Sequence, residues 1–141
     1  MTTRSPAPFS IPSTRSLTRV LVLDDDSFQL DLLSELLRSL GFVDLTCLTS
    51  AAEAMRKISA TPNCFDLVLI DLHLPGMDGF QFMEGLAMAD YKGALVIVSG
   101  QSTDVMRGAA LVAKLRRFTL LGSLCKPVER EPLAALIRGM L

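Results

Sequence analysis

Short apolar runs alternate with segments of helical spacing along most of this 141-residue chain, and this alternation limits the fold more than any other feature. Five runs have the length and β-branched content of buried strands. Such alternation is typical of an α/β domain in which helices cover both faces of a parallel sheet. The expected strands are RVLVL (19–23), FVDLTCL (42–48), FDLVLI (65–70), ALVIVSG (94–100) and LLGSL (120–124).

Five helices are expected between and after these strands. The first covers SFQLDLLSELLRSL, with Asp26 as a candidate cap at its start and Gly41 closing it. The second begins after Thr49 and Ser50, either of which could cap it, and ends near Pro62. The remaining helices are expected at about 80–89, 103–117 and 129–141.

Length and composition favour one domain. Half of the residues are apolar, enough for a substantial core. Residues 1–17, rich in Ser, Thr and Pro, are expected to form a disordered tail before a domain at 18–141. A formal net charge of -1 gives no overall attraction to nucleic acid or to a membrane. Without a signal peptide or an apolar segment of about 20 residues, a cytoplasmic protein is expected.

Several residue types that often mark sites have structural explanations here. Cys47, Cys64 and Cys125 lack the close spacing of a zinc or redox pair, so each is expected to be a small buried side chain. The side chain of His73, the one histidine, is expected to face solvent. Four methionines in or near the expected helices are expected to fill gaps in the core. They are Met77, Met83, Met88 and Met106.

Polar side chains stand at the ends of the expected strands. In an open α/β sheet, ligands bind outside the carboxyl ends of the strands, so these acidic, hydroxyl and ammonium groups should converge at one edge. Taken singly, each has a structural explanation as a helix cap, a turn residue or a solvated lysine, but their joint position favours a site. They are Asp24, Asp25 and Asp26 after the first strand, Asp71 after the third, Ser99 in the fourth and Lys126 after the fifth.

A divalent cation at this edge follows from the charges. Three carboxylates close together cannot all stay ionised in a partly buried site without a compensating cation. Oxygen ligands suit Mg²⁺, and the backbone carbonyl of His73 could complete the set. With such a metal, Asp71 can act as a nucleophile toward phosphorus and form an aspartyl phosphate. The Lys126 ammonium and the Ser99 hydroxyl would then stabilise the phosphoryl oxygens.

Four segments, VLVLDDD, LVLIDLHLPGMDGF, VIVSG and CKP, together resemble the chemotaxis-regulator-like receiver domain of two-component response regulators. The resemblance implies a flavodoxin-like (βα)5 three-layer sandwich with strand order 2-1-3-4-5. It implies a sensor histidine kinase or phosphotransfer protein as phosphodonor. A downstream effector protein or output domain would read the last helices and strand, and a homodimer could form through them. No enzymatic activity is implied beyond self-phosphorylation and autodephosphorylation.

The same resemblance assigns roles to individual residues. Asp71 is implied to be the phosphoacceptor, Asp24 and Asp25 the acidic pair that organises Mg²⁺, Ser99 the switch hydroxyl and Lys126 the contact to the phosphoryl group. The segment VMRGAALVAKLRRFTLLGSLCKP also resembles receivers that precede EAL-type cyclic-di-GMP phosphodiesterase domains.

Two details of the last strand bear on the switch. The family usually places an aromatic residue three positions before the lysine, and here that position is Ser123. The Lys126–Pro127 bond is expected to be cis, because the chain must turn sharply off the strand while Lys126 points inward, and the resemblance points the same way.

Three alternatives are weaker. A receiver-like interaction module that is not phosphorylated would not need the complete set of acidic, hydroxyl and lysine positions. A haloacid dehalogenase-like phosphatase carries a second aspartate two positions after its nucleophile, where this chain has His73. A dinucleotide-binding domain needs a glycine-rich loop after its first strand, and DDDSF has no glycine.

Overall fold

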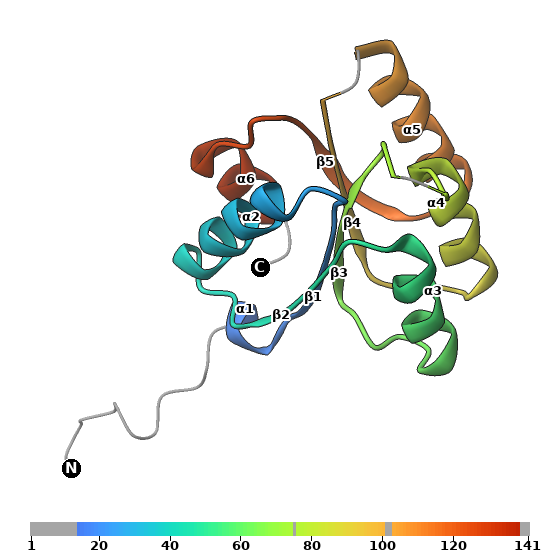
Figure 1. The fold of residues 1–141 in the computed structure, drawn as a ribbon, viewed down its shortest axis with the longest axis horizontal. Coiled ribbons are helices and arrows are strands. Elements are labelled where there is room, and N and C mark those ends of the chain that lie inside the picture. The colour runs from blue at the N-terminus through green and yellow to red at the C-terminus, as the bar shows by residue number, and fades with distance from the viewer. Residues whose placement is uncertain (1–13, 75, 101–102, 139–141) are drawn as a thin grey trace.

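The structure, a computed structural model, describes residues 14–74, 76–100 and 103–138, and residues 1–13 of the expected tail lie outside this part (Figure 1). One five-stranded parallel sheet has the order β2-β1-β3-β4-β5, which confirms the expected flavodoxin-like α/β sandwich. The strands are β1 (Arg19–Leu23), β2 (Asp44–Leu48), β3 (Leu67–Asp71), β4 (Ala94–Ser99) and β5 (Thr119–Cys125). The helices are α1 (Thr14–Leu17), α2 (Ser27–Ser39), α3 (Ala51–Ala60), α4 (Gly79–Met88), α5 (Thr103–Leu115) and α6 (Arg130–Ile137).

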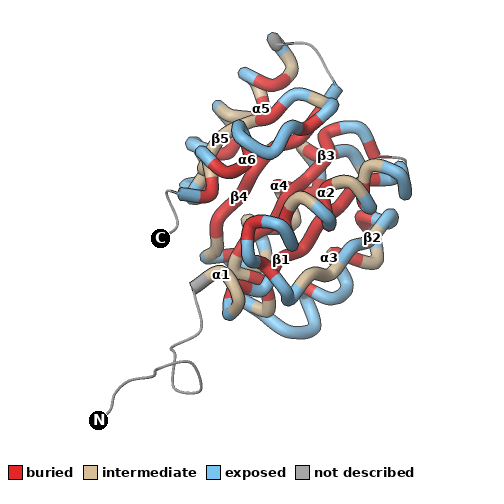
Figure 2. The backbone as a smooth tube through the Cα atoms, turned by 90° about the vertical axis from the view of Figure 1, so that its left-hand side faces the viewer, coloured by how far each residue is buried: buried red, intermediate tan, exposed pale blue. Residues whose placement is uncertain are grey.

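The core lies on both faces of the central strands (Figure 2). Successive strand residues point to opposite faces, so Leu21 and Leu23 pack with α3, α4 and α5, whereas Val20 and Val22 pack with α2 and α6. Every residue of β3 and β4 is buried, as expected for parallel strands covered on both sides. Full burial of each such side chain contributes about 1.5–3 kcal/mol to folding. The buried strands therefore hold the ends of β1, β3 and β4 in fixed positions.

Local hydrogen bonds explain where the helices begin. Asp26 is the N-cap of α2, because its carboxylate accepts from the Phe28 N–H at 2.9 Å, and Ser50 caps α3 through the Glu53 N–H at 3.2 Å. Gly41, which follows α2, has a φ of +103°, a conformation that favours glycine. These caps agree with the sequence. None of the described helices is long and apolar enough to cross a bilayer.

Helix α1 was not predicted, and it lies inside the segment expected to be a disordered tail. Arg15 holds it in place, because one guanidinium N–H donates to the carbonyl of Leu40 at 2.7 Å and the guanidinium carbon lies 5.9 Å from the centre of the Phe42 ring. The tail prediction is therefore wrong for residues 14–17, and the prediction of five helices is one too few among the described residues. These contacts depend on residues far along the chain.

The prediction that the cysteines are buried is wrong for Cys47 and Cys125 and only partly met at Cys64. Cys47 and Cys125 are exposed, and Cys64 is partly buried. Cys47 lies on β2 and Cys125 on β5, the two edge strands, each of which has a neighbouring strand on one side only. Burial at these positions depends on strand order, which alternation along the chain does not reveal.

The prediction that the four methionines fill gaps in the core is also only partly correct. Met83 and Met106 are buried in the core, as expected, and Met77 packs against it from a partly buried position. Met88 is 90% exposed, so its predicted place in the core is wrong. It is the last residue of α4, where the helix turns its side chain away from the sheet.

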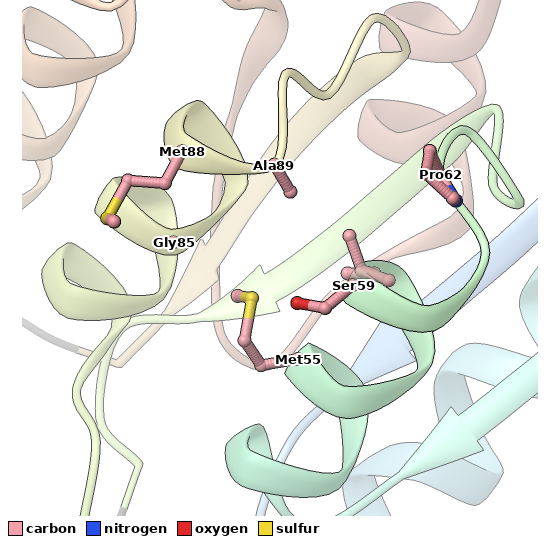
Figure 3. Close-up of a pocket in the computed structure, with 7 residues that line it drawn as sticks. Met55, Ser59, Pro62, Gly85, Met88 and Ala89 are labelled. Atoms are coloured by element: carbon pink, nitrogen blue, oxygen red, sulfur yellow. The ribbon is translucent and has the colours of Figure 1, made fainter.

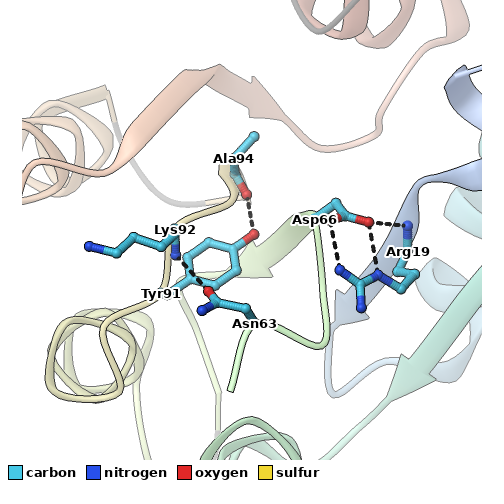
Figure 4. A network of polar contacts seen from close by, with 6 residues as sticks. All are labelled: Arg19, Asn63, Asp66, Tyr91, Lys92 and Ala94. Carbon is cyan, nitrogen blue, oxygen red and sulfur yellow. Dashed lines mark hydrogen bonds and ion pairs between the residues drawn. The ribbon is translucent and has the colours of Figure 1, made fainter. Parts of the chain in front are cut away.

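At the amino-terminal ends of the strands, polar contacts connect neighbouring segments of the sheet (Figure 4). The Arg19 guanidinium donates two hydrogen bonds to the Asp66 carboxylate, each at 3.0 Å, and these bonds hold the pKa of Asp66 below its usual range. The Tyr91 hydroxyl donates to the carbonyl of Ala94 at 2.7 Å, and burial raises the pKa of Tyr91. Each of these groups has its own partner, which makes this edge a structural one.

Candidate functional site

At the opposite, carboxyl-terminal edge, the chain places Asp24 directly after β1. The side chain of Asp24 is 1% exposed, and its Oδ1 accepts from the Asp26 N–H at 2.9 Å. The Asp24 N–H donates to the carbonyl of Leu48 at 3.2 Å, which fixes the backbone against the end of β2. Asp25 is exposed beside it. One fixed buried carboxylate and one exposed carboxylate therefore stand side by side.

Asp71 is the last residue of the fully buried strand β3, which lies between β1 and β4. It is 3% exposed and lies opposite Val98 of β4. Its Oδ1 accepts from the His73 N–H at 3.0 Å, so the loop after the strand already orients the carboxylate. His73 is exposed, as the sequence predicted.

Ser99 and Lys126 complete this edge from the two strands beyond β3. Ser99 ends β4 and is fully buried, and its carbonyl accepts from the Lys126 N–H at 3.0 Å. The Lys126–Pro127 bond is cis, which confirms the prediction. The serine and the lysine are thus fixed to each other by their backbones at the ends of adjacent strands.

The acidic and ammonium groups meet in one cluster. Carboxylate oxygens of Asp24, Asp25 and Asp71 lie within 4.8 Å of one another. The Lys126 Nζ lies 2.6 Å from Asp24 Oδ2 and 3.1 Å from Asp71 Oδ2. Its contact with Asp71 is a hydrogen bond, and its contact with Asp24 is a close ion pair. Ionised, three carboxylates face one ammonium group.

This imbalance shifts the acid–base properties of the cluster. Burial raises the pKa of Asp71, and the charge of Asp24 acts in the same direction, outweighing the lowering by the His73 N–H and Lys126. Burial lowers the pKa of Lys126, but its contacts with Asp24 and Asp71 outweigh burial, so that pKa is raised. The lysine is firmly protonated, and the cluster still lacks positive charge.

The residues present fit a hard divalent cation. Asp24 and Asp71 are both buried, and they share the single ammonium group of Lys126, so the buried carboxylates carry more negative charge than this lysine can neutralise. The nearby side-chain ligands are oxygens, which suit Mg²⁺. Asp26 is outside this set, because its carboxylate caps α2 instead.

A family model described as the response regulator receiver domain matches residues 20–138. The chain belongs to this family of receiver domains. The two-component response regulator ARR11 of Arabidopsis thaliana is 34% identical over 91 residues, which cover 64% of this chain and 17% of that protein. The receiver domain therefore spans only a small part of the length of the curated relatives it matches.

Solved structures of receiver proteins share the fold. A response regulator from Colwellia psychrerythraea superposes with a TM-score of 0.76 at 24% identity, covering 89% of this chain and 97% of that one. The CheX-CheY-BeF3-Mg+2 complex from Borrelia burgdorferi gives a TM-score of 0.74 at 19% identity, with 87% of this chain and 88% of that chain covered. At these identities the likeness concerns the fold.

Sequence reasoning missed the backbone groups of the site. The N–H groups of Asp26 and His73 orient the two buried carboxylates, Asp24 and Asp71. Backbone groups carry no signal in residue type, but in both cases the donor is two residues after the acceptor. A short polar turn directly after a buried strand was the available clue.

Proposed function

We propose that this receiver domain accepts a phosphoryl group on Asp71 from a phosphohistidine of a sensor histidine kinase or phosphotransfer protein. The support comes chiefly from the carboxylate oxygens of Asp24, Asp25 and Asp71, which lie within 4.8 Å of one another beside the Lys126 ammonium. The domain acts as a switch, and its catalytic activity is limited to its own phosphorylation and dephosphorylation.

In the transfer step, a carboxylate oxygen of Asp71 attacks the phosphorus atom. An O–P bond forms while the P–N bond to the donor imidazole breaks, and the released nitrogen, which receives the electron pair, takes up a proton from water. The Lys126 ammonium, already within reach of Asp71 Oδ2, stabilises the phosphoryl oxygens as a point charge. The Ser99 hydroxyl acts as a further donor from the next strand.

Asp24, Asp25 and Asp71, with the backbone carbonyl of His73, would hold Mg²⁺. The metal supplies positive charge for the phosphoryl oxygens during transfer. The excess of carboxylates over ammonium groups at this edge supports the assignment. A protein of the same fold, in the CheX-CheY-BeF3-Mg+2 complex from Borrelia burgdorferi, carries magnesium together with BeF3.

The response would be read on α5, β5 and α6 by a downstream effector protein or output domain, and a homodimer could form through the same elements. Because relatives such as ARR11 extend far beyond the matched region, either a separate effector or a further domain is compatible with the proposal. A cytoplasmic location belongs to the same proposal.

Acetyl phosphate with Mg²⁺ tests the function directly. Intact mass should show one added phosphoryl group on the wild type and none on Asp71→Asn. The matched control is Asp26→Asn, which removes an equivalent charge next to the site but keeps a residue able to cap α2, and it should be labelled like the wild type. A folded wild-type protein that stays unlabelled would favour the interaction module without phosphorylation, and full labelling of Asp71→Asn would refute Asp71 as the acceptor.

A further inference from the structure

A mostly apolar groove runs between α3 and α4 (Figure 3). None of the carboxylates of the phosphorylation cluster is among the residues that line it. It consists of two adjoining hollows of about 430 and 700 Å³, which share Met55 and Ser59. Three methionines line it, namely Met55, Met77 and Met88. Methionine side chains are flexible and polarisable, and they suit surfaces that adapt to a partner.

The packing of the two helices shapes this groove. A Cβ atom on Gly85 of α4 would lie 2.5 Å from Met55 Cε, so only the missing side chain lets Met55 lie against the backbone of α4. Figure 3 shows Met55 and Ser59 extending from α3 toward α4. Met88, on the α4 side, is 90% exposed. The groove thus has a floor of thioether and glycine and a methionine that no described residue covers.

The charge among the residues that line the groove is positive. Arg56 is the one charged residue among the described residues that line either hollow. It has no carboxylate partner among the residues that the structure describes, whereas Arg19 and Arg116 each pair with an acidic side chain. An apolar surface beside an unpaired guanidinium is complementary to a segment that combines large apolar side chains with a carboxylate.

The size of the groove favours a short segment over a folded domain as its occupant. The ten residues of α3 extend over about 15 Å, and two packed helices lie about 8–10 Å apart, so the face offers a few hundred Å². A stable interface between folded proteins buries roughly 800 Å² on each partner. A helix laid into a groove needs less, because a few apolar anchors at i, i+3, i+4 and i+7 carry the contact.

We propose that the groove between α3 and α4 binds a short amphipathic helix of a partner protein. This helix presents apolar side chains toward Met55 and Met88 and an Asp or Glu toward Arg56. The surface is separate from α5, β5 and α6, where the phosphorylation-dependent output is proposed. Its occupancy does not require phosphorylation of Asp71.

A displayed library of 16-residue helical peptides, selected on the full chain, provides the probe. Selected peptides should share apolar residues at helical spacing and one carboxylate, and their amide-shift footprint should cover α3 and α4. Met88→Lys and Arg56→Glu, both at exposed positions, should each weaken binding at least tenfold. Leu111→Lys is the control, because Leu111 is an exposed apolar residue on α5, and it should leave affinity unchanged.

A charge swap makes the test specific. Replacing the peptide's carboxylate with lysine should restore binding to Arg56→Glu and abolish it for the wild type. The proposal is overturned if selection yields no peptide whose binding depends on Met88 and Arg56, or if Leu111→Lys has the same effect. It is also overturned if the chain itself dimerises and Met88→Lys dissociates the dimer, because the groove would then be occupied by a second copy of the chain.

Discussion

Replacing Asp71 with Asn should stabilise the metal-free protein against urea, although it removes a charge that is hydrogen-bonded to Lys126. The repulsion between the Asp24 and Asp71 carboxylates, within 4.8 Å, is about 3–4 kcal/mol at an effective dielectric constant of about 20. Desolvation of a nearly buried carboxylate adds several kcal/mol to the cost. The attraction of Lys126 at 3.1 Å offsets about 5 kcal/mol of this.

Repulsion and desolvation together exceed the attraction of Lys126, so the free energy of unfolding of Asp71→Asn should be higher than that of the wild type by about 1–2 kcal/mol at pH 7. Lys126 keeps Asp24 as a partner, and the amide oxygen of Asn can still accept from the His73 N–H. The raised pKa of Asp71 agrees in sign, because the folded state then disfavours the ionised carboxylate. The wild type is therefore relatively more stable below the unfolded carboxyl pKa of about 4 and loses that stability as the pH rises through the raised folded pKa.

Urea unfolding followed by circular dichroism in EDTA, from pH 4.5 to 7.5, measures this difference. The gap between Asp71→Asn and the wild type should widen as the pH rises through this range, because the wild type loses stability as Asp71 ionises. The control Asp26→Asn should change stability by less than about 0.5 kcal/mol, since Asn and Asp are equivalent N-caps. If Asp71→Asn were equally or less stable than the wild type at pH 7, the account of the site's charge balance would be wrong.

Three further predictions concern the metal, the opposite edge and the switch. Asp25→Asn should weaken Mg²⁺ binding by roughly tenfold, because few protein ligands are offered, and equal binding in an NMR titration would contradict this. Tyr91→Phe should cost about 1–2 kcal/mol in urea unfolding by leaving a buried carbonyl without its donor, so an unchanged stability would refute that role. Beryllofluoride, a phosphoryl mimic, should shift amides at 99–106 more than at 120–125, because Ser123 has no large ring to bury, and the reverse pattern would contradict the reasoning.

The strands, most of the helices and the residues of the site could be predicted from the sequence, because all of them follow from the pattern of buried parallel strands. Buried parallel strands read as apolar runs, and all their carboxyl ends meet at one edge, so residues such as Asp71 and Lys126 could be brought together without knowing any distance. The cap at Asp26 was also accessible, since it depends on residues two positions apart.

What could not be predicted depends on contacts between distant segments. Helix α1 exists because Arg15 reaches Leu40 and Phe42. Cys47 and Cys125 are exposed because their strands are at the edges, a property of strand order rather than of local pattern. Met88 lies in α4 but on the face that points away from the core, because Leu86 before it and Ala89 after it pack against the core while Met88 is exposed.

Charged groups are balanced at the amino-terminal ends of the strands and unbalanced at their carboxyl-terminal ends. At the amino edge, Arg19 and Asp66 pair one to one, and the pair lowers the pKa of the carboxyl, so the fold favours both ionised forms. At the carboxyl edge, Lys126 faces more carboxylates than it can neutralise, and the pKa of Asp71 is raised. A cation bound there would relieve repulsion that folding has already imposed, so the proposed affinity for Mg²⁺ and the expected loss of stability without it would have the same origin. Removing a carboxylate from the cluster should therefore strengthen the metal-free fold and weaken metal binding together.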